Sequence, residues 1–381
     1  MSSFTSQMGF SRARRFKRKH SLGHTEMSAL EQALKSHSLS GTGPVTEQYE
    51  ESLCIWFNAR YALAVSSGSA AVMVALAAVG VKPGDEVIVS PASPLCTAYP
   101  IMSMGATPVF CDTQPDCLSL DLDMLESLIT ERTAAIVDVP MWGYPTPAAS
   151  LSRKAKARGL PLILDLAHCH GTTYQEKHLW EYSDIACFST HESKIMSTGE
   201  GGFVLTNSPE LADRAGRFRQ MDFLEGKNIG INLKLSSLQA ALGLARLDKL
   251  SEEISIRKRN ADFLKSAIGC DDIAELPVVE GACPNYYTLL LRSKSGKASD
   301  FIDHLYAHGI PSDMREYPCR PLYEFPILKY LTNPCPNATR FLLSVSTFPT
   351  HPEMDEFDLE YLAAALSNYR PRTTKSERES T

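Results

Sequence analysis

The sequence predicts an α/β protein with a mainly parallel sheet between layers of helices, followed by a smaller α+β unit. From about residue 45, short apolar segments rich in β-branched residues alternate with segments of helical spacing. Such alternation favours parallel strands joined by helices. The strand segments have no polar face, as expected for a sheet covered on both sides. The 381 residues are 44% hydrophobic, which is enough for about two domains.

The elements of the first unit are expected in a regular order. A helix over 47–60 precedes the first strand, and an Ala-rich helix over 69–81, closed by Gly80, follows it. Further helices are expected over 97–105, 121–130 and 149–159. Strands are expected over 61–65, 85–90, 107–112, 134–140, 161–167, 184–190 and 201–207. The carboxyl ends of parallel strands form the edge of a sheet at which ligands usually bind.

A long helical stretch over 236–268 leads out of this unit. Strand spacing at 285–293 and helical spacing at 298–309 and 353–366 then indicate a smaller α+β unit. The expected domains are therefore a large one over 21–250 and a small one over 251–370.

Both ends of the chain are expected to be disordered tails. Residues 1–20 are basic, and residues 371–381 are polar. The basic tail has no apolar stretch after its charges, so it is not a secretory signal. An organellar transit peptide is the alternative for this tail.

The overall composition limits the function. A net charge of −6 argues against a nucleic-acid-binding protein. The ten cysteines include no C-x-x-C pair, which argues against a zinc site, and free thiols suit a reducing cytoplasm. No apolar run is long enough to span a bilayer. We therefore expect a cytoplasmic protein that binds neither nucleic acid nor membrane and holds no metal.

A first candidate site is the sequence "VSSGSAAV" at 65–72, where a strand ends and a helix begins. Free backbone N–H groups at the start of a helix attract anions, and Gly68 lets an anion come close. Ser69 adds a hydroxyl group. The alternative is an ordinary helix cap without a ligand.

A second candidate is Asp165, at the end of the apolar strand in "LILDLAHCHG". A carboxylate there is costly to bury unless it has a partner, and a cation on a ligand is one such partner. The alternative is a cap for the next helix. His168 and His170 follow closely, but no acidic or cysteine cluster beside them supports a metal.

The third candidate is Lys194, between the strand "IACFS" and the glycine-rich "GEGG". An amine at the ligand edge of a sheet can form a Schiff base with a carbonyl group. The glycines let the chain turn back into the next strand. The alternative is a solvated lysine on a loop.

The three candidates together match one cofactor, pyridoxal phosphate. This cofactor carries a phosphate, a pyridine nitrogen and an aldehyde, and it needs a lysine and an acidic partner for its ring nitrogen. Asp165 would keep that nitrogen protonated. Lys194 would hold the aldehyde and later transfer a proton.

From about residue 21 to 366, the chain resembles the sugar aminotransferase family named for DegT, DnrJ, EryC and StrS. The lysine motif "FSTHESKIMSTGEGG" carries the resemblance most specifically. The other segments, which match in order and spacing, are "LSGTGPVTEQYEE", "SSGSAAV", "GDEVIVSP", "GATPVFCD", "GYP", "DLAHCHG" and "GINLKLSSLQAALGLARL". The family has the fold-type I architecture of pyridoxal-phosphate enzymes, which implies a large cofactor-binding domain and a smaller C-terminal domain.

The resemblance implies a role for each matching residue. Lys194 corresponds to the cofactor lysine, Asp165 to the acid on the pyridine nitrogen, and His168 to a residue beside the ring. The expected phosphate contacts are Gly68, Ser69 and Ser189. Asn232, in "GIN", matches an asparagine that reaches the phosphate held by the neighbouring subunit, which implies a homodimer with shared sites.

The sequence departs from the family pattern at three places. Pro94 stands where many members have an aromatic residue over the cofactor ring, so ring stacking must come from elsewhere, with His168 as a candidate. The segment 221–229 is short in a region that often helps to hold a nucleotide, and Lys234 replaces a common arginine. These departures concern a nucleotide-linked substrate rather than the cofactor site.

The resemblance implies an aminotransferase that uses glutamate or glutamine to aminate a keto-sugar or keto-cyclitol in amino-sugar or secondary-metabolite biosynthesis. One alternative is elimination or substitution with the same cofactor. Another is a non-catalytic binding or regulatory protein, which the presence of Lys194 and Asp165 argues against.

Substrate residues are expected in "MREYPCRPLY", namely Arg315, Tyr317, Arg320 and Tyr323. Either arginine could bind a donor carboxylate, and the alternative is a solvated surface loop.

Overall fold

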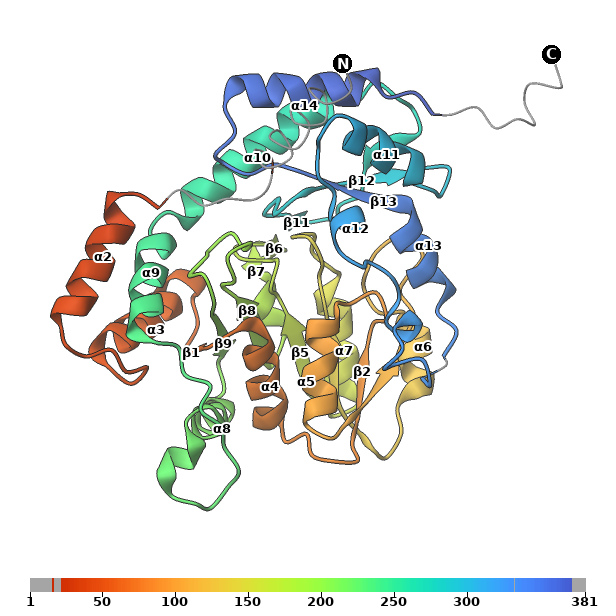
Figure 1. Ribbon diagram of the computed structural model, residues 1–381. Coiled ribbons are helices and arrows are strands. Elements are labelled where there is room, and N and C mark those ends of the chain that lie inside the picture. The colour runs from red at the N-terminus through yellow and green to blue at the C-terminus, as the bar shows by residue number, and fades with distance from the viewer. Residues whose placement is uncertain (1–15, 17–21, 332, 372–381) are drawn as a thin grey trace, which may run out of the picture.

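The computed structural model describes residue 16 and residues 22–331 and 333–371. The two expected tails lie almost wholly outside these residues. Figure 1 shows the resulting arrangement, with the large sheet and its helices below and a smaller group of elements above.

Seven strands of the described chain form one sheet in the order β1-β9-β8-β5-β4-β2-β3. Their bounds are β1 Tyr61–Val65, β2 Glu86–Val89, β3 Thr107–Phe110, β4 Thr133–Asp138, β5 Leu162–Asp165, β8 Ile185–Ser189 and β9 Gly202–Thr206. Strands β3, β2, β4, β5 and β8 pair in parallel, whereas β9 runs antiparallel to both of its neighbours. The predicted mainly parallel sheet is confirmed.

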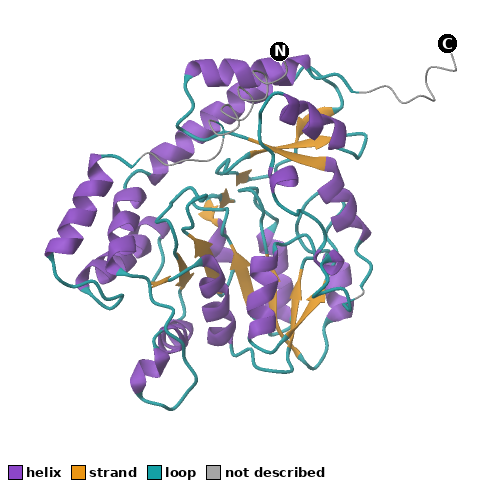
Figure 2. Ribbon diagram, in the orientation of Figure 1, coloured by secondary structure: helices purple, strands orange, loops and turns teal. Residues whose placement is uncertain are grey.

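The sheet lies inside the molecule. Every residue of β2, β5, β8 and β9 is buried, and since successive side chains point to opposite faces, both faces must be covered. Figure 2 shows the strands among the helices that cover them. The helices of this part of the chain are α2 His24–Lys35, α3 Pro44–Phe57, α4 Gly68–Val79, α5 Leu95–Ser103, α6 Leu122–Leu128, α7 Ala148–Ala157, α8 Pro209–Arg219 and α9 Ser237–Leu247, with the short turns η1 Leu179–Tyr182 and η2 Met221–Leu224. Among them, α2 packs chiefly against α9 and not against the strands.

A second, antiparallel sheet has the order β10-β12-β13. It comprises β10 Ile273–Glu275, β12 Leu289–Ser293 and β13 Val345–Phe348, and around it lie α10 Leu250–Ser266, α11 Ser299–Ala307, α12 Asp313–Glu316, α13 Pro336–Ser344, α14 Glu356–Asn368 and η3 Leu322–Glu324. A third small sheet joins β11 Ala282–Cys283 to β6 Thr173–Tyr174 and β7 Lys177–His178. A segment that follows the main sheet in sequence thus pairs with β6, which lies between β5 and β8 in sequence.

The predicted helical stretch over 236–268 is two helices. Helix α9 ends at Leu247 and α10 begins at Leu250, and Figure 1 shows them at an angle to each other. The two helices have different packing partners, because α9 packs against α2 and α3 whereas α10 packs against α14. Next to the break, the ammonium group of Lys249 lies 2.6 Å from the buried carboxylate of Glu26 in α2. Tertiary packing therefore decides where the helix is interrupted.

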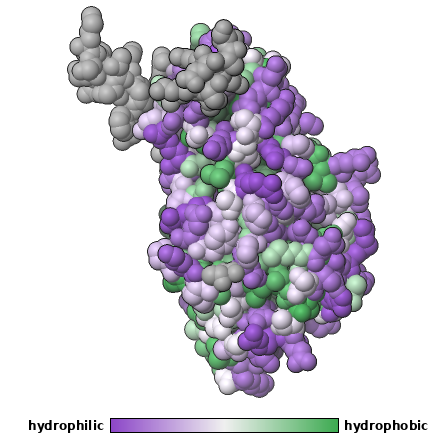
Figure 3. All heavy atoms as spheres, turned by 90° about the vertical axis from the view of Figure 1, so that its right-hand side faces the viewer, coloured by the Kyte–Doolittle hydropathy of each residue, from purple (hydrophilic) through white to green (hydrophobic). Residues whose placement is uncertain are grey.

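The surface, the cysteines and the helices each add one observation. On the face in Figure 3, hydrophilic residues predominate and hydrophobic ones form small separate groups. All ten cysteines are free thiols. Among the described residues, no helix has the length and apolar character needed to cross a membrane.

Candidate active site

The site forms at the carboxyl edge of the main sheet. Asp165 is the last residue of β5 and Ser189 the last of β8, and these two strands are paired neighbours. Lys194 lies five residues beyond Ser189 in the loop that leads to β9. Because parallel strands end at the same edge, segments far apart in sequence meet there.

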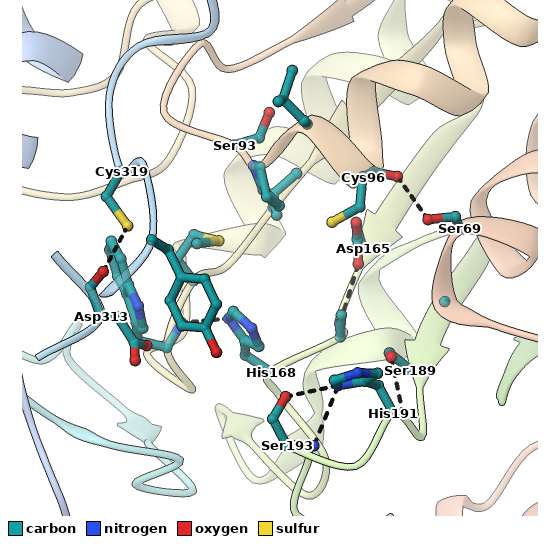
Figure 4. A pocket seen from close by; sticks show the side chains of 18 of the residues that line it. Ser69, Ser93, Cys96, Asp165, His168, Ser189, His191, Ser193, Asp313 and Cys319 are labelled. Atoms are coloured by element: carbon teal, nitrogen blue, oxygen red, sulfur yellow. Dashed lines mark hydrogen bonds between the residues drawn. The ribbon is translucent and has the colours of Figure 1, made fainter. Parts of the chain in front are cut away.

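A cavity of about 480 Å³ lies at this edge. Eight of the residues expected at the site line it, namely Gly68, Ser69, Asp165, His168, Ser189, Lys194, Tyr317 and Arg320. Figure 4 shows the side chains of Asp165, His168 and Ser189 around the same space. The structure thus brings together the three groups from which a cofactor was predicted.

The carboxylate of Asp165 is held in place by two hydrogen bonds. Thr97 donates its hydroxyl to Oδ2 at 2.6 Å, and the backbone N–H of Ala167 donates to Oδ1 at 3.2 Å. Burial raises the pKa of the Asp165 carboxyl, while these hydrogen bonds and the charge of Lys194 act in the opposite direction. A cationic group of a ligand placed against this carboxylate would offset the cost of burying its charge.

The start of helix α4 forms a cradle for an anion. Ser67 caps the helix by accepting a hydrogen bond from the N–H of Ala70 at 3.0 Å, and no acidic residue lies in the first turn. A Cβ atom at Gly68 would lie 2.7 Å from the Cβ of Ser189, so only glycine fits there. Ser69 and Ser189 line the same cavity, and the Ser69 hydroxyl donates to the carbonyl of Cys96 at 3.3 Å. Backbone N–H groups and hydroxyls in this arrangement suit a phosphate.

The loop that carries Lys194 is closed at its base by two threonines. The hydroxyls of Thr190 and Thr198 lie 2.6 Å apart, and the N–H of Thr198 donates to the carbonyl of Thr190 at 2.8 Å. Gly201 has a φ of 150°, and a Cβ there would lie 2.5 Å from the Thr190 hydroxyl oxygen. The guanidinium of buried Arg246 donates to the carbonyl of Ile195 at 3.3 Å. The glycine-rich motif therefore shapes a rigid support for the lysine.

His168 lies in the cavity within an aromatic group. Its Nδ1 accepts a hydrogen bond from the backbone N–H of Trp142 at 3.1 Å, and its ring stacks on Tyr287 with centroids 4.5 Å apart and planes 11° apart. The Nζ of Lys194 lies 5.5 Å from the centroid of the same Tyr287 ring. Pro94 also lines the cavity, so the aromatic surface near the lysine comes from Trp142, His168 and Tyr287.

Asn285 was not predicted from the sequence, and it links the segment of His168 and His170 to Tyr287. Its amide nitrogen donates to the carbonyls of His168 and His170 at 2.8 and 2.9 Å, and its oxygen accepts from the N–H of Tyr287 at 2.8 Å. Gly143 makes room for it, since a Cβ there would lie 2.0 Å from the Asn285 oxygen. Asn285 is fully buried, and it fixes the position of the His168–Tyr287 pair.

Three of the predicted residues lie outside the cavity lining. Asn232 is exposed, and its side-chain oxygen accepts a hydrogen bond from Lys234 at 2.7 Å. Arg315 pairs with Asp303 at 2.7 Å. The hydroxyl of Tyr323 lies 2.7 Å from that of Thr339. The side chains of Arg315 and Tyr323, which were expected to contact the substrate, therefore point to other residues of this chain and do not line the cavity.

His170 is a core residue rather than a ligand. It is fully buried, and its ring lies 5.3 Å from that of Phe188 and 6.0 Å from that of Phe203. Burial lowers the pKa of His170 to about 3, so the ring is neutral. Within the described residues, no group of three or more His, Cys, Asp or Glu side chains is placed to hold a metal ion.

These observations define a site for pyridoxal phosphate. The start of α4 with Ser69 and Ser189 fits the phosphate, the buried carboxylate of Asp165 fits the ring nitrogen, and Lys194 fits the aldehyde. Glycine at position 68 keeps the cradle open.

The chain belongs to the DegT/DnrJ/EryC1/StrS aminotransferase family, whose model matches residues 20–367. It is 31% identical over 340 residues to the UDP-2-acetamido-2-deoxy-3-oxo-D-glucuronate aminotransferase of Pseudomonas aeruginosa, covering 86% of this chain and 91% of that protein. It is 33% identical over 276 residues to the L-glutamine:2-deoxy-scyllo-inosose aminotransferase of Streptomyces fradiae, covering 68% of this chain and 65% of that protein.

Solved structures agree with this assignment. The crystal structure of DesV from S. venezuelae superposes with a TM-score of 0.85 at 27% identity, covering 92% of this chain and 95% of that one. The predicted family, fold and cofactor are thus confirmed, and the protein is a pyridoxal-phosphate-dependent aminotransferase of the sugar and cyclitol type.

Proposed function

We propose that this enzyme transfers an amino group from glutamate or glutamine to a keto-sugar or keto-cyclitol, as a homodimer in the cytoplasm. The observation that carries the proposal is the convergence of Lys194, Asp165 and the α4 cradle in one cavity. The relatives named above act on an oxo-sugar in one case and on an inosose with glutamine in the other. The ten free thiols fit the reducing conditions of the cytoplasm.

Each residue of the site has a separate task in this reaction. Bound pyridoxal phosphate supplies the electron-withdrawing ring that makes a proton on the amine-bearing carbon acidic. The start of α4 binds and orients the phosphate. Asp165 holds a proton on the ring nitrogen through its carboxylate, which the hydroxyl of Thr97 keeps in position. The Nζ of Lys194 would take the proton from the amine-bearing carbon of the donor and deliver it to the carbon that was the aldehyde of the cofactor.

The two half-reactions can be tested separately. Glutamate or glutamine added without an acceptor should convert the cofactor to its aminated form, and the visible absorption of the lysine-bound form should fade. A keto-sugar or keto-cyclitol should then restore that absorption. If no amino donor converts the cofactor to its aminated form, and one substrate is instead consumed with loss of water or another leaving group, the protein is an elimination enzyme.

The homodimer is supported by an apolar segment that projects from the large sheet beyond α8 (Figure 1). Asp222 keeps this segment folded by accepting hydrogen bonds from the N–H groups of Lys227 and Asn228 at 2.7 and 2.8 Å. Five hydrophobic side chains are nevertheless exposed on it, namely Met221, Phe223, Leu224, Ile229 and Ile231. An ordered apolar surface of this kind is typical of a protein interface, and Asn232 follows it directly.

Subunit mixing tests whether the sites are shared. Asn232→Ala should weaken cofactor binding, and Lys194→Ala should inactivate its own site. When equal amounts are unfolded and refolded together, half of the dimers are mixed, and each mixed dimer has one intact site. We therefore expect activity to return to about a quarter of the wild-type value per subunit.

A second mixture serves as the control. Lys194→Ala and Asp165→Asn alter residues that act on the same site of one subunit, so every site of a mixed dimer keeps one defect. This mixture should regain no activity. A fully active monomer in sedimentation experiments, or an equal response of the two mixtures, would rule out sharing through Asn232.

A further inference from the structure

The cavity has an anion cradle at one side and a segment of the second unit at the other. Figure 4 shows Asp313 and Cys319 across the cavity from Ser69 and Ser189. Arg320 follows Cys319 in the chain and lines the same cavity. The cradle is taken by the phosphate of the cofactor. A second anionic group of a bound molecule would therefore lie on the opposite side of the cavity, near Arg320.

Arg320 is the cation of that wall. Among the residues that line the cavity, the lysines and arginines are Lys194 and Arg320, and Lys194 is engaged by the cofactor. Two acidic side chains besides Asp165, Glu200 and Asp313, also line the cavity and repel anions. Arg320 is thus the cation that remains to attract a carboxylate in the cavity, and it does so on the wall that also carries Asp313.

The guanidinium of Arg320 is oriented by an aromatic ring and not by a carboxylate. Its Cζ lies 4.3 Å from the ring centroid of Phe325, and its backbone N–H donates to the carbonyl of Pro318 at 2.9 Å. In the described part of the chain, its side chain forms no ion pair. An arginine stacked on an aromatic ring keeps its N–H groups available for a carboxylate, which it binds with two parallel hydrogen bonds.

Arg315, five residues earlier, is bound differently. Its guanidinium lies 3.7 Å from the ring centroid of Tyr306 and pairs with the carboxylate of Asp303 at 2.7 Å. It does not line the cavity. The two arginines, which the sequence left as equal candidates, are therefore distinguished by the structure, and Arg315 provides a matched control.

Two apolar neighbours of Arg320 strengthen its attraction for an anion. Pro318, whose carbonyl accepts the backbone N–H of Arg320, and Phe325, whose ring lies against the guanidinium, line the cavity with it and offer no hydrogen-bonding side chain. Two opposite charges that apolar groups shield from water attract each other more strongly than the same charges in water.

We infer that Arg320 binds the α-carboxylate of the amino donor, an inference that rests on the proposed aminotransferase function. Glutamate and glutamine share this carboxylate, whereas a keto-sugar or keto-cyclitol need not carry one. Arg320 thereby selects α-amino acids among the amines that reach Lys194, and it acts as a binding residue rather than a catalytic one.

The test compares glutamate with its α-amide, in which only the α-carboxylate is neutralised, and glutamine with its own α-amide. In the first half-reaction at low donor concentration, the wild-type protein should prefer each amino acid over its amide by about 10- to 100-fold. In Arg320→Gln, the rate with the amino acid should fall to that with the amide, so that this preference disappears. Arg320→Lys should keep part of it.

Two controls accompany these variants. Arg315→Gln should keep the full preference, because Arg315 lies outside the cavity. Arg320→Gln should also retain the cofactor absorption and the rate at which its aminated form reacts with the keto acceptor, which shows that the site is intact.

The outcomes separate this inference from the proposed function. If no amino donor converts the cofactor of the wild-type protein to its aminated form, the proposed function fails. If the wild-type protein converts but Arg320→Gln keeps the preference for the amino acid, the assignment of Arg320 fails. It also fails if Arg320→Gln slows only the acceptor half-reaction, because Arg320 would then bind an anionic group of the acceptor.

Discussion

Lys194→Ala is expected to lower the rate of transamination by at least about 10³-fold, because the amine both holds the cofactor and transfers the proton. Borohydride treatment of the wild-type protein should attach the cofactor permanently to the peptide that contains Lys194. The cradle at α4 and the carboxylate of Asp165 are unchanged in the variant, so it should still bind the cofactor without a covalent bond. Mass spectrometry and the visible absorption spectrum measure the two effects.

The control is Lys82→Ala, an exposed lysine before β2 on the loop at the other edge of the sheet. This variant should keep both the labelled peptide and the activity. Attachment of the cofactor to a peptide other than that of Lys194 would contradict the assignment, as would near-normal turnover of Lys194→Ala.

The residues proposed to hold the cofactor could be predicted to lie together because most of them follow from local sequence. Asp165 and Ser189 end apolar strands, Gly68 stands at a strand-to-helix turn, and Lys194 precedes a glycine-rich return. In a parallel sheet, strand ends converge regardless of the distance between them in sequence. Recognising the strands was therefore enough to bring Gly68, Asp165 and Lys194 together, whereas Ser189 was expected only from the family resemblance.

The rest of the site depends on contacts over long sequence distances. Asn285 binds the carbonyl of His168, 117 residues away, and its own segment has the pattern of an ordinary strand. Tyr287 was missed for the same reason. The segment 314–323 contains two arginines, but the sequence does not show where their side chains point. Asp303 orients Arg315, and Phe325 orients Arg320.

Asp165→Asn is expected to have opposite effects on catalysis and on the stability of the cofactor-free protein. Turnover should fall by about 10²–10³-fold, comparable to the loss of a group that stabilises charge in the transition state, because an amide cannot keep the ring nitrogen protonated. The melting temperature without cofactor should rise at neutral pH. Asparagine can keep both hydrogen bonds, since its oxygen can accept from Ala167 and its amide can donate to the hydroxyl of Thr97.

The pH dependence of stability gives this prediction its sign. Burial raises the pKa of Asp165 above its ordinary value of 3.8, which applies to the unfolded chain. The folded state therefore binds the proton more tightly, and the contribution of Asp165 to stability is lost as the pH rises from 3.8 through the folded pKa. The gain from Asp165→Asn should accordingly be present at neutral pH and vanish in acid, where the carboxyl of the wild-type protein is protonated.

Thermal unfolding of both cofactor-free proteins across this pH range is the measurement. Thr97→Val is the matched variant, because it removes a hydrogen bond to Asp165 but keeps the charge. Burial of that charge then costs more, so Thr97→Val should lower stability at neutral pH where Asp165→Asn raises it. Both variants should lose activity, Thr97→Val less than Asp165→Asn. Normal turnover of Asp165→Asn would show that this carboxylate is not the partner of the ring nitrogen, and lower stability of the variant at neutral pH would show that it is not a costly buried charge.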